Sequence, residues 1–389
     1  MTYLFLLIIF TIPIFVYEKP TRFKESCIRK SSTYYVIECI LLIVVFGFRN
    51  YVGGDTISYI AMWDLVPDLS EVNLLNFVAS RFMPFWYFLC ASCKTISDEF
   101  WILSLTQAAI VNIVTFIAIS KLTKYRFTAS LIYLLYLSLY FNCEIMRESI
   151  AVSFFMLAFP YFIEKKWFQY YFLCFVGYMF HSSAFLCFLY PFLYRYATRK
   201  LNVRSLFVVL LFASVLFVEP LFMYISNQLP DALNIFKSDR YGELSNATWF
   251  GTVREILTSL LLFVLIRRRD RHEDVNNVVD AGLKMYWLLI TLGIGLHILT
   301  NRFANYFKLY EIVLIVQIIW VYKKKDLIPI LFIINIMFGQ YRLYTRESSK
   351  LALKHYMFYE QFYPYYSIFE NVPQDVIDNR IQYMTSENE

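Results

Sequence analysis

The chain has 389 residues, of which 59% are hydrophobic and 20% aromatic, including 39 Phe and 32 Tyr. A fold surrounded by water needs more polar surface than this sequence supplies, so the composition excludes a soluble globular protein. The formal net charge of +6 is modest, and no nucleic-acid partner is expected from it. We therefore predict an all-α polytopic membrane protein, which crosses the bilayer several times.

Apolar runs recur along the chain and predict about 12 transmembrane helices. They cover residues 2–17, 34–48, 100–119, 128–142, 145–163, 167–181, 183–194, 205–223, 251–266, 283–300, 303–322 and 326–341. The first run lacks a basic start and a small-residue cleavage site, so we expect it to be retained as a helix and not removed as a signal peptide. The segment 82–96 contains Pro84 and is predicted to form a short re-entrant or interfacial helix, with a full crossing as the alternative.

Clusters of basic residues between these runs orient the predicted helices. The clusters are Lys19 to Lys30, Lys121 to Arg126, Lys165 to Lys166, Arg195 to Arg204, Arg267 to Arg271 and Lys323 to Lys325. If all of them face the cytoplasm, an even number of crossings must separate each consecutive pair. The predicted helices satisfy this condition when residues 82–96 do not cross, and both termini are then expected on the outer side.

Composition divides the chain into a single predicted transmembrane domain, residues 1–341, and a tail, residues 342–389. In the tail the apolar periodicity fades while aromatic residues persist, which predicts an interfacial or extracytoplasmic segment. The cysteines lie mostly in apolar runs and are typical of packing residues. Cys90 and Cys93 have CxxC spacing without a second pair, so neither a metal site nor a cofactor is expected.

Several polar residues lie on the predicted outer face, next to the ends of predicted helices. The segment Arg49–Tyr59 directly follows a predicted span and contains two glycines, an aspartate and a threonine. Arg147, His181 and Arg302 lie in three further outer turns. Basic residues are uncommon on outer loops, and an unpaired charge beside hydrocarbon is expensive. The three arginines therefore predict an anionic ligand.

Each of these residues also has a structural interpretation. Arg49 can extend along the bilayer to the interface, and Arg147 can pair with Glu144 or Glu148 at helical spacing. Arg302 can extend to the interface or pair with Glu311 in the next predicted helix. His181 can hold a helix end through a hydrogen bond.

Four short motifs occur in a defined order. They are Arg49-x-x-x-Gly53-Gly54-Asp55-Thr56-x-x-Tyr59, Met146-Arg147-Glu148-x-Ile150-Ala151, Phe180-His181-Ser182-Ser183 and Asn301-Arg302-x-x-x-Tyr306. This order resembles the EpsG family of Wzy-like polysaccharide polymerases over about residues 40–310. The sequence departs from the family pattern at Glu148, where Gln is common, and in the loop 224–250, which has no matching motif.

The resemblance implies a Wzy-type, GT-C-like architecture and a glycosyltransferase of the bacterial cytoplasmic (inner) membrane. Such an enzyme joins undecaprenyl-diphosphate-linked oligosaccharide repeat units on the outer (periplasmic) face. A sugar hydroxyl of one unit attacks the anomeric carbon of another chain and expels undecaprenyl diphosphate. The expected partners are the lipid-linked oligosaccharide and the lipid bilayer, and a flippase and a chain-length regulator are further candidates.

In this reaction Arg49, Arg147 and Arg302 are predicted to bind the leaving diphosphate. A guanidinium remains charged at all relevant pH values and binds phosphate oxygens through two parallel hydrogen bonds. These properties suit the negative charge that develops on the leaving group.

The other predicted site residues are His181, Asp55, Tyr59 and Tyr306. His181 or Asp55 is the predicted catalytic base, and His181 is preferred because imidazole titrates near the working pH. Asp55 is alternatively expected to orient an arginine or to cap the helix that follows it. Tyr59 and Tyr306 are predicted to contact the sugars, and activity is expected to be independent of a metal.

Three other functions share parts of this pattern. A flippase for lipid-linked oligosaccharides would also have about twelve spans, but it should carry charges along a cavity at mid-membrane depth. An O-antigen ligase shares the reaction and differs in the acceptor. A polysaccharide acyltransferase would take its acyl donor from the cytoplasm, so its histidine and arginine should face that side. A structural subunit of a complex is the remaining alternative.

Overall fold

The computed structural model describes residues 1–18, 25–80, 82–198, 249–269, 277–294, 302–321, 326–347 and 356–387, together with Phe207 and Leu211. Within these ranges the chain forms helices and turns, with two isolated β-bridges and no strands. The prediction of an all-α protein is therefore confirmed for this part of the chain. The chain divides into two compact units: unit 1 comprises Met1–Ala158, Phe172–His181 and Gln340–Glu389, and unit 2 comprises Phe159–Tyr171 and Ser182–Gly339.

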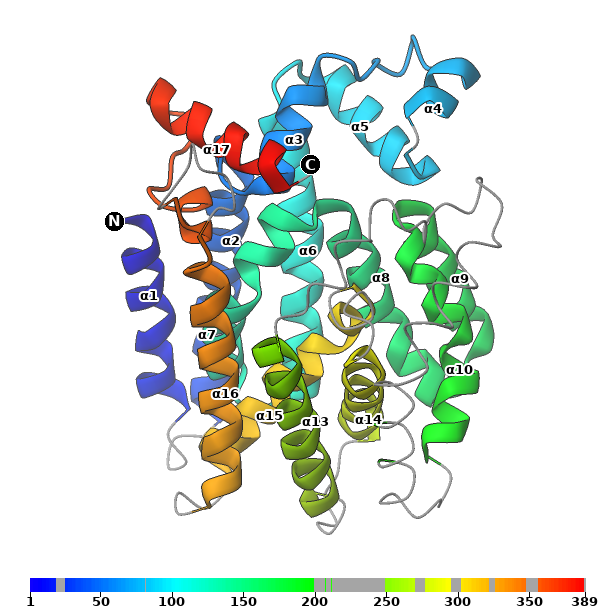
Figure 1. Cartoon of the computed structure of the whole chain (residues 1–389), viewed down its shortest axis with the longest axis vertical. Coiled ribbons are helices and arrows are strands. Elements are labelled where there is room, and N and C mark those ends of the chain that lie inside the picture. Colours follow the sequence, from blue (N-terminus) through cyan, green and yellow to red (C-terminus); the bar gives the residue numbers. More distant parts are fainter. Residues whose placement is uncertain are drawn as a thin grey trace. The chain divides into compact units, whose positions relative to one another are not determined.

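Unit 1 is built on the long helices that begin the chain (Figure 1). Its elements are α1 (Thr2–Tyr17), α2 (Glu25–Gly47), α3 (Gly54–Trp63), α4 (Leu74–Ser80), α5 (Pro84–Ile96), α6 (Trp101–Leu122), α7 (Arg126–Tyr136), the π-helical turn η2 (Tyr140–Glu144), α8 (Met146–Ile163) through Ala158, the end of α9 (Trp167–Phe180), the 3-10 helix η11 (Phe358–Gln361) and α17 (Gln374–Glu387). α2 packs along α6, and α1 packs against α7 and α2. α1 buries Leu6 and Phe10 but leaves Phe5 and Phe15 more than half exposed. An apolar helix with an exposed apolar side is what a lipid environment requires.

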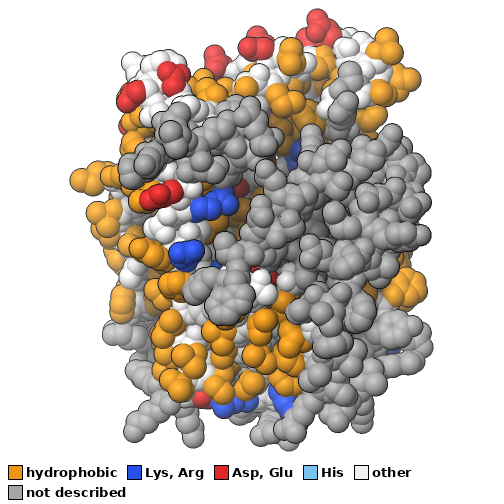
Figure 2. All heavy atoms as spheres, in the orientation of Figure 1, with side chains coloured by type: hydrophobic (Ala, Val, Ile, Leu, Met, Phe, Trp, Pro, Cys, Tyr) orange, Lys and Arg blue, Asp and Glu red, His pale blue; other side chains and the backbone are white. Residues whose placement is uncertain are grey.

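Unit 2 contains the later helices of the chain. They are the 3-10 helix η3 (Ser182–Ala184), α10 (Phe185–Thr198), α13 (Trp249–Arg269), α14 (Asn277–Gly293), the 3-10 helix η9 (Ala304–Phe307), α15 (Lys308–Trp320) and α16 (Leu327–Tyr344), the last of which ends in unit 1. α14 packs against α13, α15 and α10 and is largely buried. Figure 2 shows hydrophobic side chains over the described surface of α13 and α16.

Three helices among the described residues are long and apolar enough to cross a membrane, namely α6, α8 and α16. Shorter apolar helices occupy Thr2–Tyr17, Ser31–Gly47 and Ser182–Tyr194. The predicted run 251–266 forms the helix α13, and the segment 82–96 forms the short helix α5. The predicted run 205–223 lies outside the described residues apart from Phe207 and Leu211, as do the loop 224–248 and residues 295–300.

The predicted run 128–142 is wrong as a single helix. α7 ends at Tyr136, and the chain then forms the π-helical turn η2 before α8 begins. A π turn disrupts the regular backbone hydrogen bonds of a helix, so side chains must supply partners. Gln107 of α6 donates to the carbonyl of Phe141 at 3.1 Å, and Asn112 donates to the Asn142 side chain at 2.9 Å. These buried amides on α6 fix the turn that precedes α8.

Candidate active site

The loop between α2 and α3 buries Arg49, whose side chain is only 1% exposed. Its Nε donates to Thr56 Oγ1 at 2.8 Å, its Nη1 to the carbonyl of Phe46, and its Nη2 to Met146 Sδ at 3.3 Å. Burial lowers the pKa of Arg49 from its ordinary value, although a guanidinium remains charged inside proteins. Arg49 therefore ties the end of α2 to the first turns of α3 and α8.

The first turns of α3 and α8 cap one another. A helix N-terminus exposes backbone N–H groups that need acceptors. The Asp55 carboxylate, in the first turn of α3, accepts from the backbone N–H of Met146 at 2.9 Å. The Glu144 carboxylate, just before α8, accepts from the backbone N–H of Gly54 at 2.6 Å. Both carboxylates lie at the positive ends of helix dipoles, and together they fix the starts of α3 and α8.

Arg147 is the second residue of α8, and its guanidinium lies over two aromatic rings. Its Cζ is 5.1 Å from the ring centre of Phe82 and 5.8 Å from that of Tyr59, distances typical of cation–π contacts. Tyr59 is 7% exposed and packs on Trp86 of α5, with ring centres 5.2 Å apart. Arg147 itself is half-buried. Part of the Arg147 residue therefore remains exposed, unlike Arg49.

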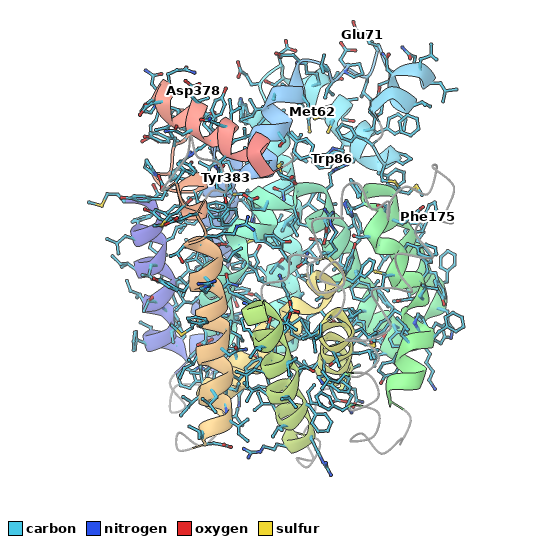
Figure 3. The ribbon with its side chains drawn as sticks, in the orientation of Figure 1. Met62, Glu71, Trp86, Phe175, Asp378 and Tyr383 are labelled. Carbon is cyan, nitrogen blue, oxygen red and sulfur yellow. The ribbon has the colours of Figure 1, made fainter. Side chains whose placement is uncertain are left out.

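The surroundings of Tyr59 keep its hydroxyl protonated. Burial raises the pKa of Tyr59, the Asp55 carboxylate raises it further, and Arg147 opposes both. Figure 3 labels Trp86, the fully buried indole of α5 that covers the Tyr59 ring. Tyr59 thus forms a buried support beneath the Arg147 guanidinium, and Trp86 packs against its ring.

His181 directly follows α9 and is half-buried. Its backbone N–H donates to the carbonyl of Gly177 at 3.0 Å. The preceding Phe180 stacks on Phe154 of α8 with ring centres 5.6 Å apart, and meets Phe85 of α5 edge-on at 5.8 Å. These contacts hold the end of α9 against the same two helices that carry the arginine and the tryptophan described above.

Arg302 and Tyr306 belong to unit 2. Arg302 is half-buried just before η9, and Tyr306 within η9 is fully buried. The hydroxyl of Tyr306 lies 2.8 Å from that of Ser183. Unit 2 therefore brings together Ser183 of one motif and Tyr306 of the other. Glu311, a partner considered for Arg302, accepts a hydrogen bond from Tyr286 of α14 at 2.7 Å.

The C-terminal tail folds onto the loop that contains Arg49. The backbone N–H of Asn50 donates to the carbonyl of Tyr366 at 2.9 Å, and that of Gly53 donates to the carbonyl of Gln361 at 3.0 Å. Arg49 itself forms an antiparallel β-bridge with Ser367. The tail thus supplies main-chain partners to a loop that has no regular structure of its own.

Arg380 on α17 completes this arrangement. It is fully buried, and its guanidinium donates to the carbonyls of Glu360 at 3.0 Å, Pro364 at 2.8 Å and Tyr51 at 2.8 Å. Burial lowers the pKa of Arg380. In Figure 3, Tyr383 points from α17 toward the rest of unit 1, whereas Asp378 points away from it. α17 therefore covers the loop with its apolar side and presents acidic residues outward.

The structure brings together four of the predicted site residues: Arg49, Asp55, Tyr59 and Arg147 lie around the first turns of α3 and α8. Within the described residues, Arg147 contacts aromatic rings and forms no ion pair with a glutamate. Asp55 does cap a helix, as one interpretation predicted, but this helix is α8 and not the one in which Asp55 lies.

Sequence reasoning missed Trp86 and Arg380 as parts of this region. It considered Glu144 only as a partner of Arg147, whereas Glu144 accepts from the backbone N–H of Gly54. No motif marks Arg380, because it binds backbone carbonyls that every residue possesses. The described part of the chain contains no group of three or more His, Cys, Asp or Glu side chains arranged to hold a metal ion.

Gly53 is expected to be intolerant of any side chain. Its φ of +87° lies in a region that L-residues rarely adopt, and an added Cβ would overlap the Cys143 side chain and lie 2.9 Å from the Cys143 carbonyl. We expect Gly53→Ala to destabilise the protein by at least about 1–3 kcal/mol from the backbone conformation alone. Thermal unfolding in detergent measures this loss.

Gly54→Ala is the matched control for this prediction. Gly54 lies in helical conformation, and an added Cβ there would meet only side-chain atoms, the Sδ of the flexible Met384 side chain and, at 2.9 Å, a carboxylate oxygen of Glu144. Its melting temperature should therefore fall by less. Equal melting temperatures for the two variants would contradict the argument from φ.

The model of the EpsG family matches residues 32–367 of the chain. No curated protein and no solved structure matches the chain. The family match and the apolar helices agree that this is a helical membrane protein. The match includes the loop with Arg49 and Asp55, the start of α8 with Arg147, and the motifs around His181 and Arg302, and it ends before α17. Because the match covers most of its length, the chain belongs to the EpsG family.

Proposed function

We propose that this protein is a polysaccharide polymerase of the bacterial inner membrane, where it crosses the bilayer about twelve times. It joins undecaprenyl-diphosphate-linked oligosaccharide repeat units on the outer, periplasmic face, without a metal ion. Membership of the EpsG family supports this proposal. The observation that carries it is the half-buried Arg147, which is held over two aromatic rings beside the capped ends of two helices.

The proposed reaction needs positive charge at the leaving diphosphate. The acceptor hydroxyl attacks the anomeric carbon, the bond to the diphosphate breaks, and the electron pair leaves with undecaprenyl diphosphate. Arg147 and Arg302, both half-buried, are proposed to bind its phosphate oxygens. Arg49 is proposed to act through the loop, because its guanidinium is turned into the protein and bonded to protein groups.

The proton of the acceptor hydroxyl needs a base. His181 is the proposed base, because it is half-buried at a helix end and a neutral imidazole accepts a proton near neutral pH. Asp55 is proposed as a positioning residue, because it already accepts a hydrogen bond from the start of α8. Tyr59 and Tyr306 are 7% and 0% exposed. We therefore propose that they support Arg147 and Ser183, in place of stacking directly on a sugar.

Purified protein in lipid vesicles is expected to convert undecaprenyl-diphosphate-linked repeat units into a ladder of longer chains. The ladder should form equally in excess EDTA, because arginines supply the positive charge that a metal would otherwise provide. Gel separation of the released glycans measures the result. Complete loss in EDTA that is restored by Mg²⁺ would contradict the metal-independent mechanism.

The same vesicle assay distinguishes the polymerase from the three alternative functions. A flippase would move labelled repeat units between leaflets without lengthening them. A ligase would lengthen nothing unless a second lipid acceptor were added, and an acyltransferase would leave chain length unchanged. His181→Ala should abolish the ladder, and a normal ladder from that variant would exclude His181 as the base.

A further inference from the structure

α13 and α16 of unit 2 run antiparallel and are joined by polar side chains. At one end, Arg268 of α13 forms an ion pair with Asp326, just before α16. Farther along, Asn335 of α16 donates to the hydroxyl of Thr258 of α13 at 2.7 Å. Both contacts follow one antiparallel register, and each satisfies polar groups in a mostly apolar helix pair.

The next pair in this register is Arg254 and Gly339, one helical turn beyond Thr258 and Asn335. A Cβ added to Gly339 would overlap the Arg254 guanidinium and lie 3.2 Å from its Cζ. The glycine therefore leaves the space in which the guanidinium lies against α16. Within the residues that the structure describes, the Arg254 side chain has no hydrogen bond or ion pair, in contrast to the other two pairs.

The surface around Arg254 is apolar and exposed. Val253 and Leu257 of α13 are 41% and 43% exposed, and Phe338 of α16 is 40% exposed. Arg254 lies about 20 Å along α13 from the Arg267–Arg269 cluster, at 1.5 Å per residue. Because that basic cluster is expected on the cytoplasmic side, Arg254 belongs to the outer half of the membrane. A charge at this depth needs an anionic partner, and the molecules that reach such a surface are lipids.

We propose that Arg254 and Gly339 form a binding site for the phosphate group of a lipid in the outer half of the membrane. The guanidinium provides paired donors for phosphate oxygens, Gly339 leaves the backbone of α16 open beside it, and the exposed apolar side chains contact the lipid tail. Two lipids carry this chemistry: the diphosphate carrier of the proposed substrate and a phospholipid headgroup. Assignment to the carrier rests on the proposed function, whereas the phosphate site itself does not.

Binding of undecaprenyl diphosphate to the purified full-length chain tests the proposal directly. Native mass spectrometry or a radiolabelled lipid gives the affinity, and undecaprenol, which lacks the phosphates, serves as the negative probe. Arg254→Gln should weaken binding at least about tenfold, the loss expected for one charge-assisted contact. Gly339→Leu should have a similar effect, because the side chain fills the place of the guanidinium. Arg254→Lys should retain part of the affinity.

Arg268→Gln is the matched control, because it removes an arginine of the same helix that already has an acidic partner. If Arg268→Gln weakens binding as much as Arg254→Gln, or if Arg254→Gln binds like the unaltered protein, the proposal fails. Phosphatidylglycerol distinguishes the two lipids: competition at equal concentration assigns the site to a headgroup, and lack of competition assigns it to the carrier. Since this is a binding measurement, absence of polymerisation would count against the proposed function and leave the Arg254 result intact.

Discussion

Arg147→Gln is expected to lower the rate of polymerisation by about 10²–10³-fold, the loss typical of removing one electrostatic donor from an active site. The side chain is half-buried above the rings of Phe82 and Tyr59, so its charge is poorly solvated and acts strongly on a nearby anion. Arg147→Lys should give an intermediate rate, because an ammonium keeps the charge but cannot bind two phosphate oxygens in parallel. Initial rates with purified lipid-linked repeat units measure both variants.

Arg126→Gln provides the control for loss of packing. Arg126 also lies over two aromatic rings, 4.9 Å from Tyr35 and 5.4 Å from Phe127, but at the first residue of α7, in a predicted cytoplasmic turn. Arg126 also donates to Ser31 Oγ at 2.7 Å and to Ser32 Oγ at 3.3 Å, so its substitution should cost at least as much stability as that of Arg147. Only Arg147→Gln should remove activity. Retention of more than half the rate by Arg147→Gln would exclude it from the catalytic machinery.

The sequence predicted most of the helices because hydrophobic runs and charged turns are local features. It did not predict the π-helical turn within residues 128–142, since that turn depends on amides of α6 far away in the chain. In the sequence, Gln107 and Asn112 are isolated polar residues in an apolar run. Only the structure shows that they donate hydrogen bonds to the Phe141 carbonyl and the Asn142 side chain. Such pairing leaves no periodic pattern to recognise.

The site was partly predictable for a similar reason. Arg49, Asp55 and Arg147 stand out as polar residues at the ends of apolar runs, so their importance was visible in the sequence. Their partners were not, because Asp55 accepts a hydrogen bond from the backbone N–H of Met146, 91 residues later, and a backbone group leaves no signal in the sequence. The inward orientation of Arg49 depends on Thr56 and Met146, and no local rule assigns a sulfur acceptor to an arginine ninety-seven residues before it.

The contribution of the C-terminal tail to the site was the least predictable feature, and substitution of Arg380 in this tail is expected to have a large effect on stability. Arg380 lies beyond the matched family region, yet its guanidinium donates to the carbonyl of Tyr51, 329 residues earlier. Tyr51 has a φ of +53°, a conformation that is costly for a residue with a bulky side chain. We therefore expect Arg380 to hold the loop between α2 and α3 in the form that orients Arg49 and Asp55.

Arg380→Met should destabilise unit 1 by about 1–3 kcal/mol, because it removes three hydrogen bonds from a buried guanidinium to carbonyls of half-buried and exposed residues. Amide hydrogen exchange should accelerate at Asn50 and Gly53, which donate to the tail, and polymerisation should fall. Arg346→Met is the control, because Arg346 lies in the same tail, is exposed and contacts the Phe358 ring at 5.9 Å. If both variants leave exchange at Asn50 and Gly53 unchanged, the loop is held without Arg380. If exchange accelerates while the rate per folded molecule is unchanged, the loop geometry set by the tail has no part in the reaction.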